Sequence, residues 1–206
     1  MKFERPLQKI VALLAGLGIL FVAYFGSYRP FEKSRLFIRA LTTPPPNLQD
    51  IQARFSQALD YPSPIGQEEL VRNTAATLFH ILQNTQDPDA IASLMRHIEN
   101  YYRPIISSGR GTSFNQNLYL LGLSNEIALM KTRNPEYFVA AREYFLEGRR
   151  RSPRRPQFLL GMFDIHLFER NTKAAKAVGE EILRYWPTDK RTRRTLQAIH
   201  REEAQD

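Results

Sequence analysis

Apolar side chains recur along most of the chain at spacings of three and four residues, the pattern of one buried face of an α-helix. Prolines and Asn-Pro or Asp-Pro pairs separate these runs, and no stretch alternates long enough to predict a strand. The pattern therefore predicts an all-α protein. The expected helices cover residues 32–41, 48–59 and 70–82, one opened by Asp87-Pro88, one around 118–129, one opened by Asn134-Pro135, and then 156–168 and 172–185.

The first apolar run differs from the others because it is apolar on every side. Ile10–Gly26 contains seventeen residues without a charge, and Ser27 and Tyr28 extend it to the length that crosses a hydrocarbon core. Lys2, Arg5 and Lys9 precede it, but no small-residue cleavage site closes it. The sequence favours an uncleaved membrane anchor over residues 1–28 rather than the buried core helix of a soluble protein.

The charges on the two sides of this run nearly balance. Arg29, Lys33, Arg35 and Arg39 follow it as closely as the three N-terminal charges precede it, so the positive-inside rule barely chooses an orientation. An N-terminal anchor most simply leaves the rest of the chain outside the cytoplasm. We expect a juxtamembrane segment with a proline break over residues 29–46, and a helical domain over 47–206.

A weak internal repeat predicts how the later helices are organised. At an offset of 34 residues, Ala141 and Pro153 align with Ala175 and Pro187. This offset is the length of a tetratricopeptide repeat, in which paired antiparallel helices stack into an α-solenoid. Repeats are clearest over residues 115–187, with a capping helix at 188–204 that turns Leu196, Ala198 and Ile199 inward; an irregular helical bundle is the alternative. The residues expected at the seams between helices are Ala141, Phe145, Pro153, Ala175, Ile182 and Pro187.

Several short motifs follow the apolar run: Tyr28-Arg29-Pro30-Phe31-x-x-Ser34-Arg35, Ala40-Leu41, Phe55-x-x-Ala58-Leu59 and Ser63-Pro64-Ile65-Gly66-x-Glu68. In this order they resemble the C-terminal tail of bacterial O-antigen ligase and polymerase family membrane proteins. In that family a tetratricopeptide-like domain often follows the last span. The resemblance implies a bacterial cytoplasmic membrane protein. The family transfers glycans with a large extracytoplasmic loop between many spans, which this sequence lacks, so no catalytic residue carries over.

The residues themselves indicate no chemistry. There is no cysteine, and His80, His97, His166 and His200 fall in separate predicted helices without ligand spacing, so we expect neither a metal nor a cofactor. The segment Ser107–Gly111 matches no phosphate-binding loop and is interpreted as a linker.

Basic residues are the one polar feature above background, with 29 Lys and Arg against 21 Asp and Glu. Two clusters lie one repeat apart. Either they are solvated turns with favourable charge at helix ends, or they form one edge that binds an anion or a partner, with nucleic acid disfavoured for a membrane-tethered chain. The cluster residues are Arg149, Arg150, Arg151, Arg154 and Arg155, and Lys190, Arg191, Arg193 and Arg194.

Two functions remain. The preferred one is a single-span scaffold, without catalysis, whose repeats bind a protein or a component of envelope-glycan assembly. The alternative is a detached tail or subunit of a glycan ligase or polymerase. The sequence predicts no particular oligomeric state.

Overall fold

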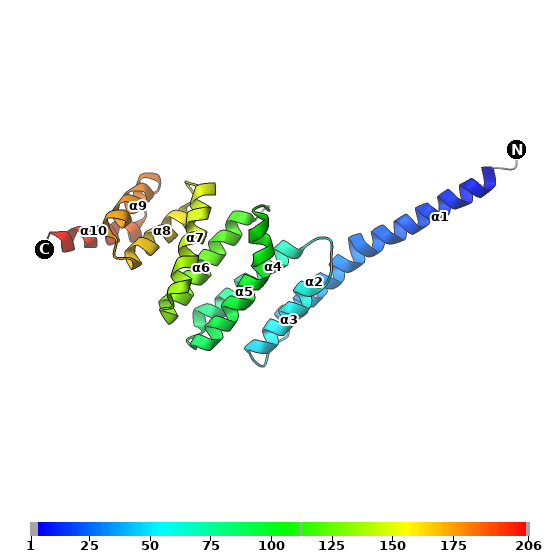
Figure 1. Cartoon of the computed structure of the whole chain (residues 1–206), viewed down its shortest axis with the longest axis horizontal. Helices are drawn as coiled ribbons and strands as arrows, with labels where there is room; N and C mark the ends of the chain where they lie inside the picture. The colour runs from blue at the N-terminus through cyan, green and yellow to red at the C-terminus, as the bar shows by residue number, and fades with distance from the viewer. Residues whose placement is uncertain (1–3, 112, 205–206) are drawn as a thin grey trace. The chain divides into compact units, whose positions relative to one another are not determined.

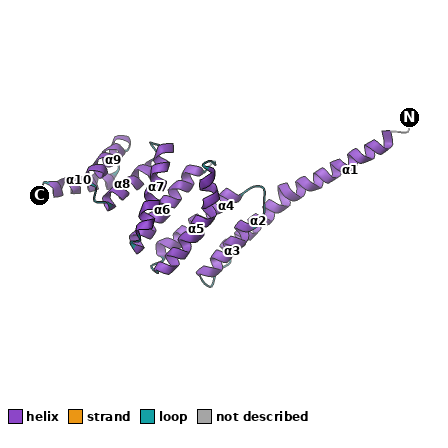
Figure 2. Ribbon diagram, viewed as in Figure 1, coloured by secondary structure: helices purple, strands orange, loops and turns teal. Residues whose placement is uncertain are grey.

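The computed structural model describes residues 4–111 and 113–204, and every regular element in these ranges is helical (Figures 1 and 2). The predicted all-α class is confirmed for this part of the chain. The elements are α1 (Glu4–Ala23), the π-helical turn η1 (Tyr24–Tyr28), α2 (Arg29–Thr42), α3 (Leu48–Asp60), α4 (Gln67–Asn84), α5 (Pro88–Ser108), α6 (Phe114–Thr132), α7 (Pro135–Arg151), α8 (Pro156–Phe168), α9 (Thr172–Tyr185) and α10 (Lys190–Glu203).

Helix starts follow the local signals closely. The carboxylate of Asp87 and the amide oxygen of Asn134 accept hydrogen bonds from the backbone N–H groups of Asp89 and Glu136, and a proline follows each cap. A capping side chain satisfies a free N–H, and proline suits the first helical position because it has no N–H to leave unpaired. The predicted bounds 156–168 and 172–185 are confirmed. The expected linker Ser107–Gly111 begins later, because α5 continues to Ser108 and Gly109 ends it in the left-handed conformation.

The N-terminal helix is longer than the sequence predicted. We expected residues 32–41 to form a separate short helix, but α1, η1 and α2 follow one another without a break (Figure 1). The backbone N–H of Arg29 bonds to the carbonyl of Tyr24, five residues earlier. This π-helical turn lies just before Pro30, and a widened turn accommodates a residue that lacks an N–H. Proline therefore marks a local adjustment here and not a helix end.

The chain divides into two compact units, residues 1–74 and 75–206. In the first unit α2 packs against α3, with the rings of Phe37 and Phe55 5.9 Å apart. The buried ammonium of Lys33, near the start of α2, donates hydrogen bonds to the carbonyls of Leu59 and Tyr61 at 3.0 and 2.7 Å. Because those carbonyls lie at the end of α3, the two helices run antiparallel.

In the second unit consecutive helices pack on one another from α5 to α10, and α6 also contacts α8. Ion pairs join second neighbours as well. Arg149 of α7 lies 2.6 Å from Glu181 of α9, and Arg191 of α10 lies 2.5 Å from Asp164 of α8. Helices α6, α7 and α8 therefore each contact both the next helix and the one after it.

Glycines let these helices approach closely. The buried ring of Phe145 on α7 lies between Gly122 of α6 and Gly161 of α8, and a Cβ at either glycine would come within 2.5 or 2.7 Å of the ring. Gly148 of α7 meets the ring of Phe158 in the same way. In the core of the second unit, aromatic rings thus fill the space that the glycines leave between helices.

The residues expected at the helix seams divide into two groups. Ala141, Phe145, Ala175 and Ile182 are completely buried, in agreement with the sequence prediction. Pro153 and Pro187 are exposed in the turns that follow α7 and α9. In α10 the prediction was wrong for Ala198, which is exposed, whereas Thr192 is buried beside Leu196 and Ile199.

Candidate functional site

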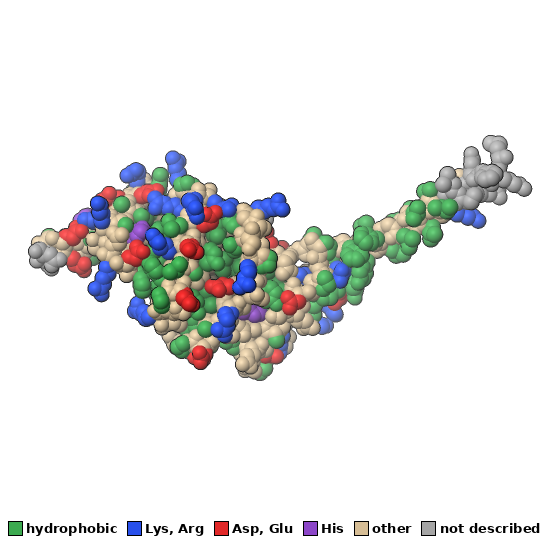
Figure 3. Space-filling model, in the orientation of Figure 1, with side chains coloured by type: hydrophobic (Ala, Val, Ile, Leu, Met, Phe, Trp, Pro, Cys, Tyr) green, Lys and Arg blue, Asp and Glu red, His purple; other side chains and the backbone are tan. Residues whose placement is uncertain are grey.

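The continuous helix Gln8–Thr42 is long and apolar enough to cross a membrane. Its most apolar window has a mean hydropathy of 2.2, and none of that window is buried. Figure 3 shows apolar side chains covering this helix, and Ile19 is 70% exposed. At 1.5 Å per residue the helix spans about 50 Å, so only about twenty of its residues fit within a hydrocarbon core. The chargeless part, residues 10–28, has that length.

Three of the basic residues that follow the apolar run have different kinds of partner. Lys33 is buried and bonded to backbone carbonyls, and Arg35 pairs with Glu32 at 2.7 Å. The Arg29 guanidinium lies over the ring of Phe25 at 5.3 Å. On the N-terminal side Lys9 is exposed, whereas Lys2 and the side chain of Arg5 lie outside the described part of the molecule.

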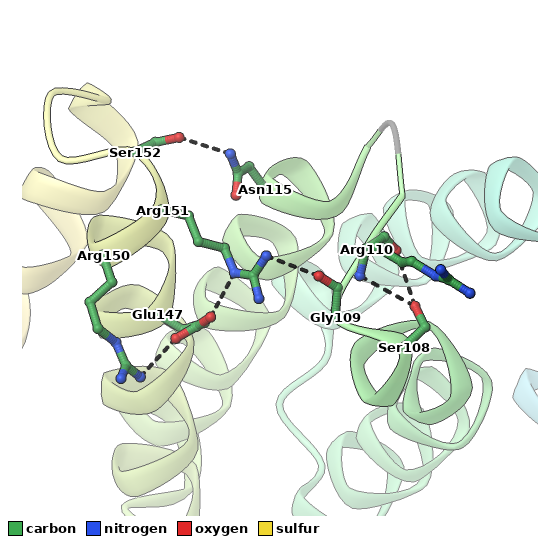
Figure 4. Close-up of polar contacts among 8 residues, drawn as sticks. All are labelled: Ser108, Gly109, Arg110, Asn115, Glu147, Arg150, Arg151 and Ser152. Atoms are coloured by element: carbon green, nitrogen blue, oxygen red, sulfur yellow. Dashed lines mark hydrogen bonds and ion pairs between the residues drawn. The ribbon is translucent and has the colours of Figure 1, made fainter.

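The first basic cluster covers the last turn of α7 and the turn that follows it, and each of its members contacts a carboxylate or an aromatic ring. Arg149 links α7 to α9 through Glu181. Arg150 and Arg151 share one carboxylate, that of Glu147, at 2.7 and 2.6 Å (Figure 4). The two remaining guanidiniums lie over aromatic rings, Arg154 over Tyr185 at 5.6 Å and Arg155 over Phe158 at 5.7 Å.

In the second basic cluster, two of the four residues contact other parts of the chain. Arg191 forms a two-pronged pair with Asp164, at 2.5 and 3.1 Å, and Arg193 donates to the carbonyl of Pro187. The side chains of Lys190 and Arg194 are exposed, and within the described residues no ion pair is found for either. Of the nine basic residues singled out in the sequence, Arg149 thus joins α7 to α9, and Arg191 joins α8 to α10.

A basic cleft of about 520 Å³ lies where α5 ends, α6 begins and α7 ends. Arg151 is fixed at its wall, because Nε donates to Glu147 and Nη1 donates to the carbonyl of Gly109 at 2.9 Å (Figure 4). Its guanidinium also lies 4.3 Å from the centre of the Phe114 ring. No carboxylate is among the described residues that line this cleft. Its lining is Gly109, Arg110, Gly111, Ser113, Phe114, Asn115, Gln116, Arg151 and Arg155.

Sequence reasoning found two of the three arginines in the basic cleft and missed the rest. Arg110 belongs to the segment interpreted as a linker, and no sequence motif indicates a binding role for Asn115. Asn115 donates from Nδ2 to the hydroxyl oxygen of Ser152 at 2.8 Å, which ties the start of α6 to the end of α7 (Figure 4). The cleft combines guanidinium and amide donors, which suits the binding of a carboxylate or a phosphate.

A second polar group lies on α6 and α8. Burial raises the pKa of Glu126 to about 7, with a further upward contribution from Asp164 and a downward one from Arg191. Burial also raises the pKa of Asp164, against the lowering effect of the Arg191 pair. Nothing in the sequence marked Glu126, because a single glutamate within a helix ordinarily belongs to a solvated face.

The four histidines lie on four different helices, α4, α5, α8 and α10. Among the described residues there is no group of three or more histidine, aspartate or glutamate side chains placed to hold a metal ion. His166 instead contacts the carboxylate of Glu169 through Nδ1, at 3.0 Å, near the end of α8.

The motifs that resemble the O-antigen ligase tail lie mostly in the first unit, where several of their residues pack α2 on α3. Phe55, Ala58 and Leu59 are buried on α3. The hydroxyl of Ser63 donates to the carbonyl of Ile65 in the turn before α4. No family model, no curated protein and no solved structure matches this chain.

Proposed function

We propose that this protein is a membrane-anchored helical-repeat scaffold, without catalysis of its own, that binds a protein or an envelope-glycan-assembly partner. The anchor is the apolar part of Gln8–Thr42. The tetratricopeptide-like helix pairs form the binding domain on the extracytoplasmic side of a bacterial cytoplasmic membrane.

The observation that carries the anchor is the complete exposure of the apolar window in this helix. Leu17, Leu20 and Val22 are each more than half exposed, on a helix whose apolar side chains point in every direction. A soluble monomer rarely exposes a continuous apolar surface of this size. Insertion into a lipid bilayer removes this apolar surface from water and so avoids the free-energy cost of its exposure.

Three observations support the repeat assignment. Ala141 and Ala175, 34 residues apart, are both completely buried on the second helix of their pairs. Consecutive helices pack on one another, and ion pairs join α7 to α9 and α8 to α10. In a stack of repeats the corresponding helices of successive pairs are neighbours in the same way.

The anchor is tested by membrane extraction of the full chain with alkaline carbonate and high salt. We expect the wild-type chain to remain with the membrane. A double variant, Leu14→Arg with Leu17→Arg, places two charges in the apolar core of the span and should release the chain.

The matched control places the same two charges near the other end of the same continuous helix, as Ile38→Arg with Leu41→Arg. These side chains are similarly exposed, at 56% and 47%, but lie beyond the twenty residues that fit the hydrocarbon core. The control should stay with the membrane. Release of the wild-type chain, or equal behaviour of the two double variants, would remove the anchor from the proposal.

A further inference from the structure

A second cleft adjoins the basic cleft. It has a volume of about 400 Å³ and lies between α6 and α7, where Ile106, Phe114, Leu118, Tyr144 and Leu146 line it. Phe114 and Arg151 line both clefts. The Arg151 guanidinium is bonded to Glu147 and Gly109 (Figure 4) and lies over the Phe114 ring. It therefore forms a fixed wall shared by a basic cleft and an apolar one.

The basic cleft has unneutralised positive charge. Of its three arginines, Arg151 pairs with a carboxylate, whereas no ion pair with a described carboxylate is found for Arg110 or Arg155. In Figure 4 the side chain of Arg110 points away from Arg151. The two helices that begin here, α6 and α8, also lack a side-chain cap, so the positive ends of their dipoles add to the field. The unneutralised positive charge of this cleft favours the binding of an anionic group.

The apolar cleft has a different electrostatic character. Its rim carries Glu143 and Glu147 together with Arg150. Glu147 is already paired with Arg150 and Arg151, whereas no ion pair is found for Glu143 among the described residues. A continuous anionic surface, such as a bilayer of acidic lipid, would bring negative charge onto Glu143. A peptide segment avoids this conflict, because its charge is confined to single side chains and its backbone offers N–H donors to Glu143.

We propose that the two clefts together bind an acidic peptide segment of a partner protein. A carboxylate of the segment enters the basic cleft, and an apolar side chain one or two residues away enters the apolar cleft. In an extended chain, residues two apart lie about 7 Å from each other on the same side, which suits two clefts that share one wall. This inference rests on the proposed scaffold function, and it specifies the chemistry of the partner.

The test uses the full chain in nanodiscs of phosphatidylcholine and a fluorescent glycine-serine decapeptide. The peptide carries one aspartate and, two positions later, one phenylalanine. A scrambled peptide of the same composition places these two residues at opposite ends. We expect the paired peptide to bind at least about fivefold more tightly, because only it fills both clefts at once.

Three variants locate the binding. Arg155→Gln should weaken binding of the paired peptide about tenfold, since a hydrogen bond to a charged group is lost. Arg154→Gln is the matched control: it removes the same charge one residue away, from a guanidinium that lies over Tyr185 and lines neither cleft. It should change the affinity less than twofold. Leu146→Asn should abolish the preference for the paired over the scrambled peptide.

Equal binding of the two peptides, equal effects of the two arginine variants, or no binding up to about 1 mM peptide would overturn the inference. The basic cleft would instead be assigned to lipid or phosphate if phosphatidylglycerol nanodiscs or inorganic phosphate bound more tightly than the peptide and Arg155→Gln weakened that binding about tenfold. A chain that resists extraction but fails these tests refutes only this inference. A chain that binds the peptide but leaves the membrane on washing refutes only the anchor.

Discussion

The contact of Phe145 with two glycines makes a sharp prediction about the second unit. In Gly161→Ala a new Cβ would lie 2.7 Å from three atoms of the Phe145 ring. The ring cannot retreat, because Gly122 approaches it from α6 with a Cβ position only 2.5 Å away. The helical propensity of alanine favours the variant by about 1 kcal/mol, whereas overpacking a filled core costs about 1–3 kcal/mol. Because the ring is enclosed on both sides, we expect an overpacking cost of about 2–3 kcal/mol, which leaves a net destabilisation of about 1–2 kcal/mol.

The assay is urea unfolding of the full chain in detergent micelles, followed by far-ultraviolet circular dichroism. Gly18→Ala is the matched control, because no atom lies within 4 Å of its Cβ position and it lies in the apolar helix outside the second unit, so the unfolding midpoint of the second unit should not change. Phe145→Leu removes the ring, so the pair Phe145→Leu with Gly161→Ala should be less unstable than the sum of the two single variants. A Gly161→Ala variant that is more stable than the wild type would show that propensity prevails and that the ring is not enclosed as described.

Two further predictions concern buried positions. The pKa of Glu126 is raised from 4.5 to about 7 in the folded chain, so the stability that its protonation provides is present below about pH 4.5 and is lost as the pH rises through about 7. Glu126→Gln should therefore match the wild type at about pH 4 and be more stable by about 2 kcal/mol at about pH 8. We expect less than about 1.36 kcal/mol for each unit of the pKa shift, because the Glu126 side chain is partly exposed. Urea unfolding at both pH values tests this, with the exposed Glu180→Gln as the control, and an equal gain at both values would contradict it. Ala175→Glu places a carboxylate in a completely buried helix contact and should cost about 3 kcal/mol, and an unchanged thermal midpoint would remove the close packing assigned to this seam.

Much of the fold follows from local signals. The bounds of α8 and α9, and the caps at Asp87 and Asn134, depend on residues within a few positions of each helix end, so the sequence alone predicts them. The continuation of the first helix past Pro30 was not predictable in this way. Proline usually begins or ends a helix, and only the π-helical turn beside it shows that it does neither here.

The candidate site was less predictable than the fold. Arg151 and Arg155 stood out as part of a basic cluster, but Arg110 and Asn115 join them only because α6 and α7 pack as a pair. Contacts between other helices partly bury Glu126 and give Arg149 and Arg191 their partners, at sequence separations of 32 and 27. These contacts depend on which helix follows which in space, and no local pattern encodes them.

The most direct test of the central claim is the reactivity of single cysteines toward a membrane-impermeant maleimide. The chain has no cysteine of its own, so each introduced thiol is the only one present. In intact spheroplasts we predict that Leu17→Cys reacts only after detergent is added, whereas Gln197→Cys, on an exposed position of α10, reacts at once. Reaction of Leu17→Cys as fast as that of Gln197→Cys would place the first helix in water, and reaction of Gln197→Cys only after lysis would place the C-terminal helices in the cytoplasm.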